Sequence, residues 1–189
     1  MNDAKKVTFG KPMVGGAIFA APLGTTLPTS SSEELDAAFA GLGYVSEDGL
    51  SNENSPETEA IKAWGGDTVL VVQQGKPDKF SFKLIEAINI DVLKTVYGPN
   101  NVSGDLDTGI TLKANSGELP SMSYVIDMIL KGGILKRIVI PHGSIDEIEE
   151  IIYSDSDAVG YGLGVQALPD SQGNSHYEYI KSGATPVGE

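Results

Sequence analysis

One short amphipathic segment limits the folds open to this chain more than any other feature. Asn89 is a residue type favoured at helix N-caps, and Ile90, Leu93 and Val96 then recur at helical spacing. The glycine–proline pair at 98–99 ends the segment. A helix of about two to three turns does not hold its apolar face in water, so it must pack on a sheet.

The remaining apolar segments predict strands. Runs that alternate or are rich in β-branched residues lie at 14–21, 43–45, 68–73, 79–85, 109–114, 123–130, 134–140, 158–168 and 176–180. The 23 glycines and 10 prolines supply frequent turns, and a hydrophobic fraction of 40% suffices for a core. The sequence therefore predicts a mainly-β fold, a sandwich or barrel, with one packed α-helix.

Two turn sequences predict hairpins. Lys131-Gly132-Gly133 joins 123–130 to 134–140, and the turn at 75–78 joins 68–73 to 79–85.

Two further segments carry helix signals. Ser32 is placed to cap a short helix through 35–39. Ser144 and Glu147 form a capping box in 144–152, where the isoleucine spacing fits a helix.

We expect one domain, residues 13–180, with a flexible N-terminal arm (1–12), a flexible C-terminal tail (181–189) and a long polar loop (46–60). The apolar run at 13–23 is interrupted by glycine and proline and is too short for a membrane span or a secretion signal. No membrane association is expected, and the chain is expected to be cytoplasmic when made.

Composition excludes several kinds of chemistry. Without cysteine, the chain has no disulfides, thiolate nucleophile or thiolate metal ligand. The net charge of −13 disfavours a surface that grips phosphates, because such surfaces need basic patches. An acidic surface keeps a protein soluble, and it also lets DNA pass without adhering.

No segment has a complete catalytic or metal-binding motif. His142 and His176 each lie beside a turn, with no nucleophile elbow in the sequence. The stretch 105–109 resembles a calcium loop, but Ile110 replaces the required glycine and no glutamate occupies the twelfth position. A capped turn is the better interpretation. We expect no enzyme, no metal and no cofactor.

Three other patterns are better explained structurally. The glycines at 160–164 lack the helix of a dinucleotide site and indicate close backbone packing. Pro77 replaces the Ser or Thr of a P-loop. Glu147, Glu149 and Glu150 indicate a solvated face, since no aromatic residues for binding sugar lie nearby.

Several blocks together resemble a known family. They are GYVSEDG, SPETEAIKAWGGD, VYGPNNVSGDLDTGITLKAN, VIDMILKGGILKRIVIP and DAVGYGLGVQALPDSQGNSHYEYI. In these blocks, spread over residues 16–180, the chain is similar to the major tail (tail tube) proteins of long-tailed, siphovirus-type bacteriophages.

The resemblance implies a structural virion protein of the phage tail. Its subunits would form six-fold rings that stack into a hollow tube for DNA ejection. Its partners would be other copies of itself and the initiator at the tail tip, tape measure and terminator proteins. It also implies a strand at 144–152. The alternatives are a tube protein of a contractile or injection machine, and a virion-displayed β-sandwich that binds a ligand.

Two sets of residues are candidates for this role. Ile61, Trp64 and Tyr44 are candidates for the subunit interface, because a lone tryptophan after a polar segment is a typical interface anchor. The alternative is that the aromatic residues Trp64 and Tyr44 belong to the core of the subunit, which is the default for such side chains. Acidic residues in strand-like sequence are candidates for the lumen wall, where DNA passes without specific binding: Asp67, Asp78, Asp127, Glu147 and Glu149.

Overall fold

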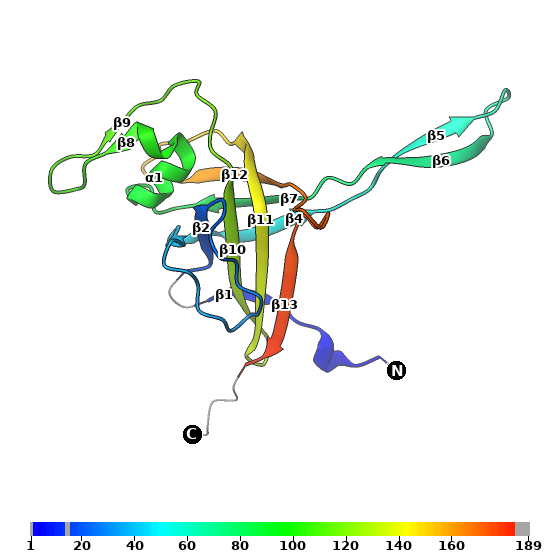
Figure 1. The fold of residues 1–189 in the computed structure, drawn as a ribbon, viewed down its shortest axis with the longest axis horizontal. Coiled ribbons are helices and arrows are strands. Elements are labelled where there is room, and N and C mark those ends of the chain that lie inside the picture. The colour runs from blue at the N-terminus through cyan, green and yellow to red at the C-terminus, as the bar shows by residue number, and fades with distance from the viewer. Residues whose placement is uncertain (1, 14–15, 184–189) are drawn as a thin grey trace.

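The computed structural model describes residues 2–13 and 16–183, and it is built mainly from antiparallel strands with one α-helix (Figure 1). The strands are β1 (Gly10–Pro12), β2 (Ile18–Pro22), β3 (Ala40–Gly41), β4 (Val45–Glu53), β5 (Glu57–Lys62), β6 (Thr68–Gly75), β7 (Lys79–Leu84), β8 (Val102–Ser103), β9 (Thr111–Leu112), β10 (Met122–Leu130), β11 (Ile134–Ile148), β12 (Tyr161–Ala167) and β13 (Tyr177–Ser182). The helices are α1 (Ile90–Tyr97) and the 3-10 turns η1 (Ala4–Lys6) and η2 (Pro99–Asn101). The predicted mainly-β fold is confirmed.

Nine strands form one sheet in the order β3-β2-β10-β11-β12-β7-β4, with β1 paired to β10 and β13 paired to β11. The long strand β11 organises this sheet. It pairs with β10 along one side, and along the other side it pairs first with β13 (residues 134–139) and then with β12 (residues 143–148). Figure 1 shows β12, β7 and β4 running across the direction of β10, β11 and β13. The sheet thus changes direction where β11 changes partner.

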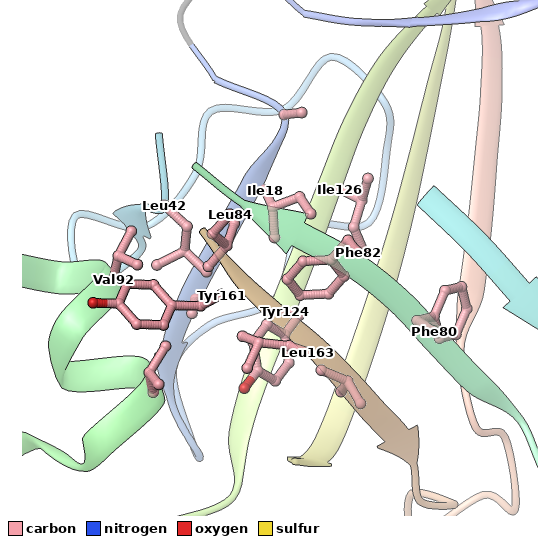
Figure 2. Close-up of a cluster of buried hydrophobic side chains, with 14 of the residues drawn as sticks. Ile18, Leu42, Phe80, Phe82, Leu84, Val92, Tyr124, Ile126, Tyr161 and Leu163 are labelled. Atoms are coloured by element: carbon pink, nitrogen blue, oxygen red, sulfur yellow. The ribbon is translucent and has the colours of Figure 1, made fainter. Parts of the chain in front are cut away.

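Strands β10 and β11 are buried on both faces. Tyr124 and Ile126 point into the main core, and Val125 points into a second cluster on the other face, as period-two alternation requires. Helix α1 covers the main core with Val92 and its neighbours, beside β7 and β12 (Figure 2). Each fully buried aliphatic side chain contributes about 1.5–3 kcal/mol.

The predicted helix and one predicted hairpin are confirmed. The Asn89 side chain accepts a hydrogen bond from the Asp91 backbone N–H, and Gly98, at φ +92°, ends the helix. Between β10 and β11, Gly132 and Gly133 both have positive φ, as a tight turn between twisted strands requires.

Gly43 forms a corner between the two ends of the sheet order. Only residues 42–44 separate β3, at one end, from β4, at the other, so the curved sheet brings its ends together here. Gly43 has φ +71°, and a Cβ atom there would overlap the Glu86 carboxylate. That carboxylate accepts a hydrogen bond from the Tyr44 N–H, which fixes the corner.

Three predicted segments are wrong. Residues 46–60, expected as a loop, form most of β4 and β5, which are polar because most of their side chains face solvent. Residues 68–85 do not form a hairpin, because β6 pairs with β5 whereas β7 pairs with β4 and β12. Residues 32–39 contain turns instead of a helix, because the Asp36 carboxylate accepts a bond from the Ala38 N–H.

The segment 144–152 is a strand up to Ile148, as the resemblance implied. The predicted arm at 1–12 includes β1, whose three residues pair with β10. The predicted strand at 14–21 begins at Ile18 among the described residues, and its residues 14–15 lie outside them. The predicted tail at 181–189 includes the end of β13, and its residues 184–189 also lie outside the described residues.

Candidate assembly surface

Strands β5 and β6 form a two-stranded hairpin that projects away from the body of the subunit (Figure 1). They pair only with each other in the described part of the chain, and every residue from 55 to 74 is exposed. An isolated two-stranded hairpin is marginally stable in water, so this one requires further contacts.

Both faces of this hairpin carry apolar side chains. Ile61 lies opposite Leu70, and both therefore occupy one face. Ala60 lies opposite Val71 on the other face. The four consecutive residues 69–72 are all among the exposed large hydrophobic residues of the subunit. Contiguous exposed apolar surface of this kind marks an interaction site.

The hairpin turn presents Trp64 to solvent. The Ala63 N–H donates to the Asp67 carbonyl at 2.8 Å, and the Gly66 N–H donates to the Ala63 carbonyl at 3.0 Å. These bonds close the turn, and the indole at its apex has a relative exposure of 107%. Lys62 and Asp67 flank the indole with opposite charges.

A buried polar junction anchors the root of the hairpin. The Asp78 carboxylate accepts a hydrogen bond from the Asn52 amide on β4 at 2.8 Å, and its other oxygen lies 2.5 Å from His176 Nδ1. The His176 ring also packs edge-on against Phe80, with ring centroids 5.2 Å apart. This junction joins β4, which precedes the hairpin, and the start of β7, which follows it, to the segment that precedes β13.

The structure brings together two of the three candidates for the interface. Ile61 and Trp64 share the hairpin, whereas Tyr44 lies on the body at the Gly43 corner. All three side chains are exposed, Tyr44 at 75%. Exposure makes all three accessible to a neighbour, and their role in an interface stays a prediction.

Two of the five candidates for the lumen wall are excluded by burial. Asp78 and Asp127 are 3% and 5% exposed, and both are paired inside the subunit. A buried carboxylate requires such a partner, so neither lines an aqueous channel. The others are exposed: Asp67 on the hairpin, and Glu147 and Glu149 near the end of β11. Lys79 hydrogen-bonds Glu147 at 2.8 Å, and this bond holds the pKa of the Glu147 carboxyl below its usual value.

The other segments considered for chemistry have structural roles. Hydrogen bonds from the Thr108 side chain and backbone hold the pKa of Asp105 below its usual value, so this carboxylate caps its own turn. Gly162 and Gly164 lie in β12, where Cβ atoms would overlap the side chains of Glu149 and Lys79. Among the described residues, no group of three or more acidic or histidine side chains is placed to hold a metal ion. Nor does any helix described here have the length and apolar character to cross a membrane.

Sequence reasoning missed Val69, Leu70, Val71 and Val72 as surface residues. The signal was the absence of alternation in TVLVVQ, since a continuous apolar run predicts burial on both faces. The subunit itself provides no such burial, because the partner strand β5 covers only one edge.

The fold and this surface together define a class of protein. A mainly-β subunit that holds an ordered apolar hairpin outside its own core is suited to association with other subunits. A family model described as phage tail tube protein matches residues 9–188. The chain therefore belongs to the phage tail tube protein family, and it is a structural subunit of the tail of a bacteriophage virion. A comparison with curated proteins finds no significant match.

Proposed function

We propose that this protein polymerises as stacked six-fold rings that form the tail tube of a siphovirus-type phage and the conduit for DNA ejection. A single domain, residues 13–180, carries the assembly contacts, and other virion proteins at the two tube ends start and stop elongation. The observation that carries this proposal is the exposed apolar hairpin β5–β6.

The two apolar faces of the hairpin support a polymer over a simple dimer. One neighbour covers one face, so burial of both Ile61–Leu70 and Ala60–Val71 requires two surrounding surfaces. The contacts are head-to-tail when each face of the hairpin packs on a different patch of a neighbouring subunit. Such heterologous contacts generate rings or filaments.

The test compares two aspartate substitutions on the same face of β6. Val71→Asp places a charge in the proposed apolar contact, whereas Gln73→Asp changes a residue that is already polar. We expect Val71→Asp to abolish assembly, measured by sedimentation and negative-stain microscopy, and Gln73→Asp to retain rings and tubes. Both monomers should match the wild type in free energy of unfolding within about 0.5 kcal/mol, because both sites are exposed.

The proposal is overturned in either of two cases. One is a wild-type protein that stays monomeric at high concentration and also fails to elongate on a preformed tail tip. The other is a Val71→Asp protein that forms tubes as readily as Gln73→Asp.

A further inference from the structure

A groove in the body of the subunit lies between β1 and β4, and its volume is about 480 Å³. Its floor is formed by Ile18 and Ile126, which belong to the main core, and its walls include Pro12, Leu50 and Met128. Cavities of this size enclose ring-sized groups when their lining is apolar. The groove therefore has the volume and the apolar floor to hold one ring-sized side chain, although Ser46, Glu47 and Asp127 also line it.

One rim of the groove is acidic. Glu47 and Asp48 lie in the irregular part of β4, where the register with β7 shifts between Val45 and Leu50, and Glu47 lines the groove. Both residues are exposed, and neither forms a salt bridge within the described residues. Lys11 lies between the groove residues Gly10 and Pro12 on β1, so strand alternation directs its side chain to the other face, where Nζ lies 5.6 Å from the centre of the Phe9 ring.

The hairpin turn has the complementary arrangement. Trp64 is a fully exposed indole at the apex, with Lys62 on one side and Asp67 on the other. When the indole enters the groove, Lys62 can face the acidic rim formed by Glu47 and Asp48. The match thus combines one apolar group with one pairing of opposite charges.

The hairpin does not reach the groove of its own subunit. Strand β6 has 8 residues, which at about 3.4 Å per residue places the turn roughly 24 Å from the root, directed away from the body (Figure 1). A hairpin turn that enters the groove must therefore belong to a second copy of the chain.

We infer that the groove between β1 and β4 is the receptor for Trp64 of a neighbouring subunit. This inference rests on the proposed function and names the surface that the hairpin contacts. Turn and groove are different patches, so the contact propagates from subunit to subunit. The indole supplies buried apolar area, and the acidic rim sets the orientation of the hairpin through Lys62.

The absence of native cysteine allows a direct test by disulfide trapping. Ala63→Cys places a thiol beside Trp64 and leaves the indole intact. It is combined with Ser46→Cys, a near-isosteric change in the groove. The matched control combines Ala63→Cys with Ser121→Cys, a half-buried serine in a different cavity near α1. Disulfides form only when the two Cα atoms approach within about 7 Å.

After assembly and mild copper–phenanthroline oxidation, we expect the Ser46→Cys pair to give a ladder of covalent oligomers on a denaturing gel. The Ser121→Cys pair should stay monomeric on the same gel. Tubes that form normally but give no ladder through position 46, or an equal ladder through position 121, overturn the inference and leave the proposed function intact. A wild type that assembles neither alone nor on a tail tip overturns both.

Charge exchange provides a second measurement that does not depend on thiol geometry. Lys62→Glu alone, and Glu47→Lys with Asp48→Lys, should each raise the protein concentration needed for assembly by about threefold to tenfold. In the triple variant that combines them, the logarithm of this concentration should return at least halfway from the values of the separate variants to that of the wild type. Additive losses in the triple variant would contradict the inference.

Discussion

Asp127 on β10 and Arg137 on β11 lie directly opposite each other and form a buried two-pronged ion pair. Arg137 Nε donates to Asp127 Oδ1 at 2.6 Å, and Nη2 donates to Oδ2 at 2.7 Å. The remaining nitrogen, Nη1, donates to the backbone carbonyls of Ser30 and Glu33. One guanidinium therefore links two strands to the long connection between β2 and β3.

We predict that Arg137→Met destabilises the subunit by about 3–5 kcal/mol, because it leaves the Asp127 carboxylate buried without its partner. The measurement is urea unfolding of the monomer at neutral pH. Lys136→Met is the control, since the neighbouring Lys136–Glu178 pair is more exposed and should contribute about 1 kcal/mol or less. Equal losses of unfolding free energy in the two variants would show that burial of the Asp127–Arg137 pair does not add to the cost of removing a partner.

The Gly43 corner gives a second prediction. Gly43 and Gly49 have similar backbone angles, φ +71° and +74°, but a Cβ atom would overlap Glu86 only at position 43. Gly49→Ala should cost about 1–2 kcal/mol, the usual penalty for a side chain in this conformation. Gly43→Ala should cost clearly more, because it also displaces the Glu86 carboxylate from the Tyr44 N–H. Thermal unfolding of both variants tests this order, and a smaller loss at position 43 would contradict it.

Local signals predicted the parts of the fold that depend on local interactions. The α1 segment carries its own cap and stop, and the Gly132–Gly133 turn joins strands that are adjacent in sequence. The hairpin expected at 68–85 was wrong because the choice of partner was not local. Strand β7 does alternate between half-buried and buried residues, as its pattern predicted, but one of its partners, β12, lies far along the chain.

The same limit affected the candidate site residues. Asp78 and Asp127 resemble surface acids in sequence, since their partners His176 and Arg137 are identified only after folding. For Trp64 the sequence left the core and an interface both open; the structure exposes the indole, and its role in an interface stays a prediction. The strands β4 and β5 were missed because their polar composition is typical of loops, and strand pairing through the backbone does not require apolar side chains.

The contact between Lys79 and Glu147 predicts a dependence of stability on pH. The bond to Lys79 holds the pKa of Glu147 below its usual 4.5, and the bonds to Glu147 and Asp146 raise the pKa of Lys79 above its usual 10.5. The lowered carboxyl pKa contributes stability that is present above pH 4.5 and lost as the pH falls through the lowered value. The raised amine pKa contributes stability that is present below pH 10.5 and lost as the pH rises through the raised value.

Lys79→Met should therefore flatten the acid limb of a plot of unfolding free energy against pH, measured with urea between about pH 3 and 7. The effect should be small, because both partners lie near the surface. Lys113→Met serves as the control, since Lys113 is exposed and forms no salt bridge in the described residues. An acid limb of unchanged slope in Lys79→Met would contradict the prediction.

Trp64→Ala should impair assembly far more than folding. The indole is fully exposed, so its loss should change the free energy of unfolding of the monomer by no more than about 0.5 kcal/mol. The concentration needed for assembly should rise by at least about tenfold, as for a central interface aromatic residue. Limited proteolysis should also cleave the exposed segment 55–67 in the monomer and spare it in the assembled tube. A variant that fails to fold would place the indole in the subunit core and contradict the prediction.

The last prediction concerns the wall of the proposed conduit. Duplex DNA carries one negative charge per about 1.7 Å of axis, so lysines along the wall would create many contacts that slow its passage. Of the original candidates, Asp67, Glu147 and Glu149 remain exposed, and Glu149 packs against Gly162 at the end of β11. Repulsion between such acids across water is screened beyond about 8 Å at physiological salt, so rings tolerate it.

Virions carrying Glu149→Lys should therefore contain tubes of normal length but release DNA more slowly, measured by dye fluorescence after triggered ejection. The same comparison with Asp67→Lys and Glu147→Lys identifies which of the three acids face the lumen. Glu34→Lys is the control, because Glu34 is an exposed acid in the connection between β2 and β3 and was not a candidate for the wall. Unchanged ejection rates in all three candidate variants, or an inner wall that maps as mainly basic, would show that this surface does not line the path of the DNA.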